Sequence, residues 1–238
     1  MDQSEPEQGD DLQRLDLLHD SSTHWRSMSD SEGSEALSEA CDLLRDSEAL
    51  QRRIALLDQP HIKPLTRFAE ELSARSSAVP YFDPLDGGCE AKVLVLLESP
   101  ARLASRPRFV SLDNPVPAQR NLKRFFDEAG LARRQSVLWN VFPWLPASDG
   151  PRETLTIGEI ERGIGELPSL IGLLPDLRVI VLAGRKAQRA FSMLTQLPGS
   201  PVILTTPHPS PLAVCRFPDV ATNIVETLKR AARVAASR

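Results

Sequence analysis

Four short apolar runs, each followed by a helical pattern, constrain the fold of this chain more than any other feature. They lie at residues 92–97, 136–141, 177–183 and 202–205. Short, nearly continuous apolar runs are typical of strands that are buried on both faces. Because strands that alternate with helices form parallel sheets through right-handed crossovers, the sequence predicts an α/β fold. We expect a three-layer αβα arrangement around a central four-stranded parallel sheet.

The helical patterns between these runs have recognisable ends. Residues 117–129 form one predicted helix, and Gly130 suits the left-handed position that often follows a helix. Residues 157–174 are mostly helical, but Pro168 predicts a kink or break within them. Two further helices are predicted at 185–197 and 220–236. The sequence contains no internal repeat.

The chain before the first run has a different character. Residues 1–34 are rich in Ser, Asp, Glu and Gln, and this composition predicts a disordered acidic N-terminal segment. Residues 35–90 are predicted to be a helical extension, and residues 91–238 the globular domain. Within the extension, apolar residues follow helical spacing after Pro64. These are Leu65, Phe68, Ala69 and Leu72. Turn-forming residues occupy 81–88.

The charge is unevenly distributed along the chain. Residues 1–50 hold fourteen acidic and three basic residues, which gives this segment a net charge of −11. Since the whole chain carries −4, the remainder carries +7. A basic globular part favours a polyanionic partner. The acidic segment is compatible with a polyanion mimic that shields the basic face, a docking arm for a partner, or a solubilising tail.

The cysteines and the apolar runs exclude several classes of protein. Cys41, Cys89 and Cys215 are widely separated, so they form neither a disulfide framework nor a metal-binding knuckle. Buried thiols in a reducing cytoplasm are the expected account of them. The longest apolar runs are too short to span a bilayer, and the polar, acidic start does not resemble a signal peptide. We therefore expect a cytoplasmic protein with no membrane partner.

Polar side chains follow three of the predicted strands at their carboxyl ends, which share one edge of a parallel sheet. They are a carboxylate, an amide and an imidazole: Glu98, Asn140 and His208. His208 lies in the loop 205–216, where prolines at alternate positions predict a stiff segment without a regular helix. Together they indicate a site. Each also has a structural alternative, because Glu98 and Asn140 are compatible with caps and His208 with a bond to backbone.

Three motifs resemble those of the uracil-DNA glycosylase superfamily. They are Leu97-Glu98-Ser99-Pro100-Ala101, Trp139-Asn140-Val141 and His208-Pro209-Ser210-Pro211-Leu212-Ala213-Val214-Cys215-Arg216. The last is similar to the His-Pro-Ser-Pro-Leu-Ser loop of the classical enzymes, whereas the first is closer to the Gly-Glu-Ala-Pro-Gly motif of the iron–sulfur group. Arg106-Pro107-Arg108-Phe109-Val110 resembles the Arg-Pro-Phe-Val segment of that group. The resemblance covers about residues 92–235 and implies a uracil-DNA glycosylase-like domain within 91–238.

The resemblance implies hydrolysis of the N-glycosidic bond between uracil and deoxyribose in DNA. His208 would be catalytic and donate a hydrogen bond to uracil O2 as the base leaves. Asn140 would bind the uracil edge, because an amide offers both a donor and an acceptor. Glu98 would be catalytic as well, positioning water or stabilising the sugar cation. No metal is required where preorganised donors stabilise the departing anion in a dry pocket.

Two positions depart from the family pattern. Ser99 stands where the classical enzymes carry a water-activating aspartate, so we expect Ser99 to contribute only its backbone beside Pro100 in substrate binding. Leu97 replaces the usual glycine, which weakens the expectation of a close backbone approach to the ligand. The three cysteines cannot supply the four ligands of an iron–sulfur cluster. No cofactor is therefore expected.

The remaining motif residues imply contacts with DNA. Phe109 would stack under the flipped base, and Leu212 would fill the position that the base has left. Ser210 and Arg216 would hold flanking phosphates, which positions the protein without reading sequence. On residue type alone, Phe109 and Leu212 are also compatible with burial in the core, and Arg216 with a surface ion pair.

The sequence thus predicts a monomeric, monofunctional DNA repair glycosylase that acts on uracil or a related deaminated base and leaves an abasic site. Its partner would be DNA containing the damaged base, in the cytoplasm and at the nucleoid in a bacterium. One alternative is a superfamily member with weak or no catalysis that binds damaged or single-stranded DNA, motivated by Leu97 and Ser99. Another is hydrolysis of a different nucleobase or nucleotide bond.

Overall fold

A computed structural model describes residues 44–103, 107–145, 154–199 and 201–237 of the chain. The chain divides into two compact units, Met1–Asp42 and Leu43–Arg238, and only the second contains described residues. The predicted disordered segment therefore lies outside the described residues. None of the described helices is long and apolar enough to cross a membrane.

The centre of the second unit is a four-stranded parallel sheet. Its strands are β2 (Val93–Leu97), β4 (Ser136–Asn140), β5 (Val179–Ala183) and β6 (Val202–Thr206). They lie in the order β4-β2-β5-β6. Every residue of β2, β4 and β5 is buried, as expected of strands covered on both faces. The predicted α/β fold with four parallel strands is confirmed.

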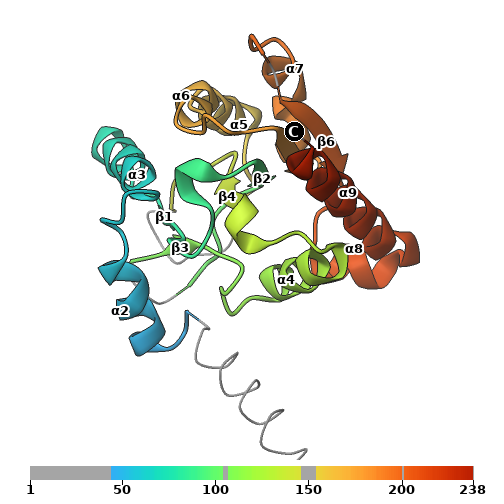
Figure 1. Cartoon of the computed structure of the whole chain (residues 1–238), viewed down its shortest axis with the longest axis horizontal. Helices are drawn as coiled ribbons and strands as arrows, with labels where there is room; N and C mark the ends of the chain where they lie inside the picture. The colour runs from blue at the N-terminus through green and yellow to red at the C-terminus, as the bar shows by residue number, and fades with distance from the viewer. Residues whose placement is uncertain (1–43, 104–106, 146–153, 200, 238) are drawn as a thin grey trace, which may run out of the picture. The chain divides into compact units, whose positions relative to one another are not determined.

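Helices cover both faces of this sheet (Figure 1). One group contains α4 (Pro117–Ala129), α8 (Pro211–Arg216) and α9 (Pro218–Ala236), and α9 packs on β5, β6 and β2. On the other side lie α5 (Ile157–Ile164) and α6 (Leu167–Gly172). Each of these helices contributes apolar residues to one continuous core that includes the sheet. The result is the predicted three-layer αβα arrangement.

Most predicted helix ends are confirmed, and one helix differs. Gly130 ends α4 with a φ of 64°, and the break expected at Pro168 separates α5 from α6. The helix predicted at 185–197 is wrong, because this segment forms a 3₁₀ turn, η3 (Ala187–Ala190), and a single α-helical turn, α7 (Phe191–Leu194). No side chain caps the start of η3, and Pro198-Gly199 prevents the helical segment from continuing.

The residues before the sheet contribute to the same core. Helix α2 spans Ser47–Ala55 and α3 spans Lys63–Arg75. The four positions predicted for the buried face of α3 are buried, and Phe68 contacts Phe82 and Trp139 at ring distances of 6.4 and 6.0 Å. Residues on both sides of position 91 therefore pack in one core.

A second, two-stranded parallel sheet joins β1 (Tyr81–Phe82) to β3 (Phe109–Val110). The sequence predicted only a turn over 81–88, because two residues are too few for a recognisable strand pattern. The short helix η1 (Gly88–Glu90) follows β1. This small sheet fixes the starting points of two loops that carry buried aspartates.

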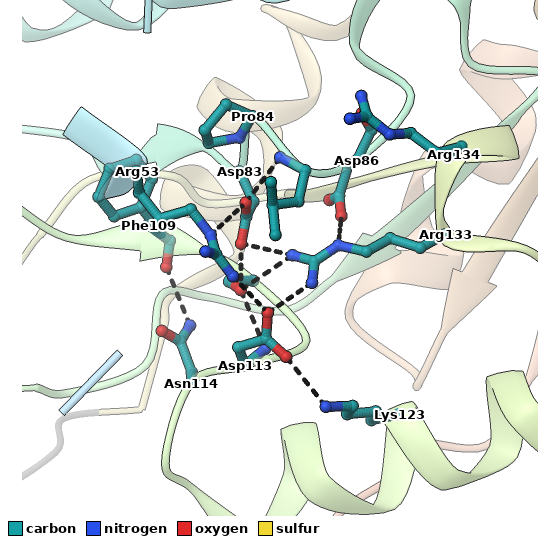
Figure 2. A network of polar contacts seen from close by, with 12 residues as sticks. Arg53, Asp83, Pro84, Asp86, Phe109, Asp113, Asn114, Lys123, Arg133 and Arg134 are labelled. Atoms are coloured by element: carbon teal, nitrogen blue, oxygen red, sulfur yellow. Dashed lines mark hydrogen bonds and ion pairs between the residues drawn. The ribbon is translucent and has the colours of Figure 1, made fainter. Parts of the chain in front are cut away.

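Two arginines and three buried aspartates form one ionic network between these loops (Figure 2). Arg53 of α2 is 2% exposed; its Nε donates to Asp83 at 3.0 Å and its Nη2 to Asp113 at 2.8 Å. Arg133, in the turn η2 (Arg133–Gln135), donates to Asp83, Asp86 and Asp113 at 2.5–2.7 Å. Lys123 of α4 also contacts Asp113, at 3.3 Å. The network thus links α2, both loops, α4 and η2.

Asp86 and Asp113 shift in pKa in opposite directions because their surroundings differ. Burial raises the pKa of Asp86 to about 7, although the neighbouring Arg133 opposes the shift. Burial also acts on Asp113, but the charge and hydrogen bond of Arg133, with Lys123 and Arg53, outweigh it and lower the pKa of Asp113 below its ordinary value. Asp86 therefore changes charge near neutral pH.

We predict a pH-dependent stability that Asp86 causes. Its folded-state pKa lies above its unfolded value, so the stability that it contributes is complete below 3.8 and is lost as the pH rises through about 7. Asp86→Asn removes this component. The free energy of unfolding of the variant, relative to wild type, should therefore increase between pH 4 and 8 in urea titrations. Exposed Asp58 provides the control as Asp58→Asn, and an equal pH slope in wild type and Asp86→Asn would contradict the assignment.

The network also predicts the effect of losing one buried cation. Arg53→Met leaves Asp83 and Asp113 with one arginine fewer, and breaking a buried pair typically costs about 3–5 kcal/mol. The neighbouring Arg52 contacts Glu48 on the surface, so Arg52→Met should cost less than about 1 kcal/mol. Urea denaturation of both variants measures the difference. Similar losses for the two would show that the buried pairs add little.

Candidate active site

The topology of the sheet places Glu98 at a reversal of strand order. From β2 the chain proceeds to β4 on one side, whereas β5 leads to β6 on the other. Ligands of open α/β sheets bind at the carboxyl ends of strands beside such a reversal. Glu98 follows β2, and its Oε1 accepts a hydrogen bond from Nζ of Lys186 beyond β5 at 3.0 Å. Both side chains are about one quarter exposed.

Lys186 was not predicted as a site residue. The only sequence signal was its position shortly after the third apolar run, and arginine and lysine at such positions are common on surfaces. Its contact with Glu98 spans 88 residues and becomes visible only once β2 and β5 lie side by side. The ion pair holds the carboxylate in one place at the edge of the sheet.

His208 has a defined hydrogen-bonding state. Its Nδ1 accepts a hydrogen bond from the backbone N–H of Ser210 at 3.1 Å. Because a backbone N–H can only donate, Nδ1 carries no proton, and the neutral ring carries its hydrogen on Nε2. The imidazole packs over Gly184, where a Cβ would lie 3.0 Å from the His208 Cβ. Gly184 also has a φ of 89°, so both its conformation and its lack of a side chain are needed.

The loop that carries His208 contains a short helix that was not predicted. Ser210 Oγ accepts from the Ala213 N–H at 3.4 Å and caps α8, with Pro211 at its start. The prediction that the prolines exclude a helix is wrong here, because the missing N–H of proline is harmless in the first turn. Asn121 of α4 donates to the Pro209 carbonyl at 3.0 Å and attaches the loop to that helix.

Helix α8 exposes the residues expected to contact DNA. Leu212 is 75% exposed, which excludes the alternative of burial in the core. Arg216 forms no salt bridge within the described part of the chain, and its guanidinium lies 5.5 Å from the ring centre of Phe217. The structure thus presents Leu212 and Arg216 to solvent from the same short element.

A cleft of about 350 Å³ lies beside this loop. Its walls come from the segment after β2, the first turn of α4 and the His208 loop. The lining residues are Leu97, Ser99, Pro100, Ala101, Arg102, Val116, Pro117, Ala118, Gln119, His208, Pro209, Ser210 and Pro211. The structure therefore brings together four of the predicted site residues. Ser99 and Pro100 lie on one side of the cleft, and His208 and Ser210 lie on the other. Gln119 is an additional lining residue that the sequence did not indicate.

Asn140 lies at the end of β4, in register with Leu97 of β2. It is 1% exposed, and its Nδ2 has no hydrogen-bond partner among the described residues. An unsatisfied buried donor costs about 1–3 kcal/mol. Such a group calls for an explanation, and a missing ligand is one. Helix α5 backs this position closely, because a Cβ on Gly163 would lie 1.7 Å from the Val141 carbonyl oxygen.

Phe109 lies elsewhere. It belongs to β3, is 3% exposed, and packs in a small cluster with Leu44 and Leu50, with its ring 6.1 Å from that of Tyr81. Its carbonyl accepts from Asn114 in the network region of Figure 2. The pairing of β3 with β1 buries the residue, so the structure does not bring it to the cleft. Arg106 of the same motif lies outside the described residues.

The described residues include no group of three or more His, Cys, Asp and Glu side chains that could hold a metal ion. The three aspartates of the ionic network already accept hydrogen bonds from Arg53 and Arg133.

The fold and the cleft define an α/β protein whose site lies at the carboxyl ends of parallel strands. A family model described as "Uracil DNA glycosylase superfamily" matches residues 80–230. The chain belongs to this superfamily, which confirms the resemblance and supports a DNA glycosylase-like hydrolase. A structure of wild-type SMUG2 from Pedobacter heparinus is similar with a TM-score of 0.45 and 12% identity, over 76% of this chain and 87% of that one. No match is found among curated protein sequences.

The position of Gly184 under His208 yields a prediction. Gly184→Ala places a side chain 3.0 Å from the His208 Cβ at a φ of 89°, and both effects destabilise the folded state. We expect a loss of more than about 1 kcal/mol in the free energy of unfolding. Gly158→Ala, in open space within α5, should be neutral or stabilising. Thermal and urea unfolding compare the two variants, and equal effects would contradict the packing.

Proposed function

We propose that this protein hydrolyses the N-glycosidic bond of uracil, or of a related deaminated base, in DNA and leaves an abasic site. One observation carries the proposal: the Ser210 N–H to His208 Nδ1 hydrogen bond, which keeps the hydrogen on Nε2 of a residue that lines the cleft. A neutral N–H donor of this kind suits a base that departs as an anion. Membership of the superfamily supports the same reaction class.

In the proposed reaction, the bond between C1′ of deoxyribose and N1 of uracil breaks. Its electron pair moves to the base, and negative charge develops on O2. The His208 Nε2–H donates to this oxygen and stabilises the charge without a full proton transfer. Water then adds to C1′ and loses a proton, which gives the abasic sugar.

In this proposal, Glu98 acts on the positive charge that develops on the sugar. It lies between Leu97 and Ser99, both of which line the cleft. Its carboxylate would stabilise the positive sugar and accept the proton of the attacking water. Lys186 fixes its orientation through the 3.0 Å ion pair. Lys186 is thus a positioning residue rather than a catalytic one.

Asn140 would recognise the base. Its unpartnered Nδ2 can donate to a base carbonyl, and the amide oxygen can accept from the adjacent ring N–H. Uracil offers this alternation of acceptor and donor on one edge. Ser99 and Pro100 line the cleft from the loop after β2 and would contact the base from that side.

The exposed helix α8 would face the DNA. Leu212 would fill the space that the flipped nucleotide leaves. The Ser210 hydroxyl accepts from Ala213 but retains its own hydrogen for a phosphate oxygen. Arg216 would contact a neighbouring phosphate, which would make binding weaker at high salt.

A second candidate is DNA binding without base release. It is favoured by the ion pair itself, because Lys186 occupies Oε1 of Glu98 and competes with a water molecule for that oxygen. Tight, salt-sensitive binding of damaged DNA without base release from any lesion would support this second function.

We predict that His208→Ala and Asn140→Ala each lower the rate of uracil release by about 100-fold or more, because each removes a donor from the charge-stabilising set. The assay measures alkali-labile breaks in oligonucleotides that contain uracil, hypoxanthine, xanthine or an alkylated base. His61 contacts the Pro84 carbonyl away from the cleft, so His61→Ala serves as the control and should retain activity. Full activity in both site variants would refute the assignments.

A further inference from the structure

The end of α8 carries a large exposed aromatic side chain that the proposed reaction does not use. Phe217 directly follows this helix and is 55% exposed. Leu212, on the first turn of the same helix, is 75% exposed. The two apolar groups therefore stand on one short element, beside the loop that is proposed to face DNA.

The exposure of Phe217 does not come from a loose chain end. Its backbone is extended, with a φ of −130°, and its N–H donates to the Ala213 carbonyl at 3.2 Å. Its own carbonyl accepts from the Val220 N–H at 3.1 Å. Hydrogen bonds on both sides thus hold the residue at the junction of α8 and α9, with its ring in solvent.

A positive charge accompanies the ring. The guanidinium carbon of Arg216 lies 5.5 Å from the centre of the Phe217 ring. An exposed aromatic ring beside an arginine is the combination that binds single-stranded nucleic acid, because the ring stacks on a base and the cation contacts the backbone. A protein partner would not require a cation here, whereas the phosphates of DNA are complementary to it.

The spacing of the two apolar groups fits a nucleotide strand. The helix rises by about 6 Å from Leu212 to Arg216, and the extended step to Phe217 adds at most about 3.3 Å. A stacked strand rises by about 3.4 Å for each nucleotide. With Leu212 at the vacated position, Phe217 reaches a base about two nucleotides away. In a duplex that base is stacked on both sides, so its face is accessible only when it is unpaired.

We propose that Phe217 is a stacking platform for an unpaired base about two nucleotides from the excised one, and that it gives the protein a preference for single-stranded DNA. The proposal rests on the DNA-facing role of the His208–Arg216 loop. It adds a contact and a strand preference that the glycosylase reaction does not require.

The test compares Phe217→Ala with Phe191→Ala. Phe191 is 45% exposed on α7 and provides a matched aromatic control on another element. Binding is measured by fluorescence anisotropy, at one fixed salt concentration, for a uracil-free single-stranded oligonucleotide and for its duplex. We expect Phe217→Ala to weaken single-strand binding about tenfold, with little change for the duplex and no change in either for Phe191→Ala. Phe217→Trp should keep the single-strand affinity.

Several results would overturn the inference. Equal losses for single strand and duplex would make Phe217 a general contact rather than a platform for unpaired bases. If Phe217→Ala binds both oligonucleotides with the same affinity as Phe191→Ala, the ring does not stack on DNA. If sedimentation shows that Phe217→Ala converts a dimer to a monomer, the ring belongs to a protein interface instead. If the wild-type protein binds neither the single strand nor the duplex, the proposed function fails as well. If wild type binds or cleaves DNA and Phe217→Ala does not alter single-strand affinity, this inference alone fails.

Discussion

The buried contacts of Asp83 and Asp113 with Arg53 and Arg133 attach α2 and η2 to the two loops that follow β1 and β3. Moving such charges out of water costs several kcal/mol for each ion, and only multiple well-placed partners compensate for this cost. Here each aspartate contacts both arginines. Arg53 belongs to α2, which precedes the region matched by the family model. The glycosylase-like domain therefore relies on a side chain from outside that region.

The backbone after Asp113 connects the ionic network to the cleft. Asp113 stands three residues before Val116, and the turn between them is closed by the Val116 N–H to Asn114 carbonyl hydrogen bond of 2.7 Å. Val116–Gln119 then lines one wall of the cleft. The same helix, α4, holds the opposite wall, since Asn121 attaches the His208 loop. Ionic contacts thus fix one end of α4, and its first turns set the relative positions of both walls.

Local patterns sufficed for some of this architecture and failed for other parts. The four central strands and α4 were predictable, because short apolar runs and a terminal Gly130 are visible within a few neighbouring residues. The positions of Ser99, Pro100, His208 and Ser210 at one cleft followed from their places after β2 and β6. The β1–β3 pairing, Lys186 beside Glu98, and Phe109 in its own cluster were not predictable. Each depends on contacts between residues 28 or more positions apart.

The charges around the cleft agree with the proposed reaction. Departure of the base creates a cation at the sugar and an anion at the base, and a site that favours one charge alone would bind the intact substrate poorly or the products too tightly. Glu98 and Lys186 compensate each other at rest, and His208 enters as a neutral donor. The ion pair and the neutral ring therefore carry no net charge before the bond breaks. In the proposed reaction, the carboxylate and the Nε2–H gain strength only as charge develops, which is the condition for lowering the barrier rather than only binding DNA.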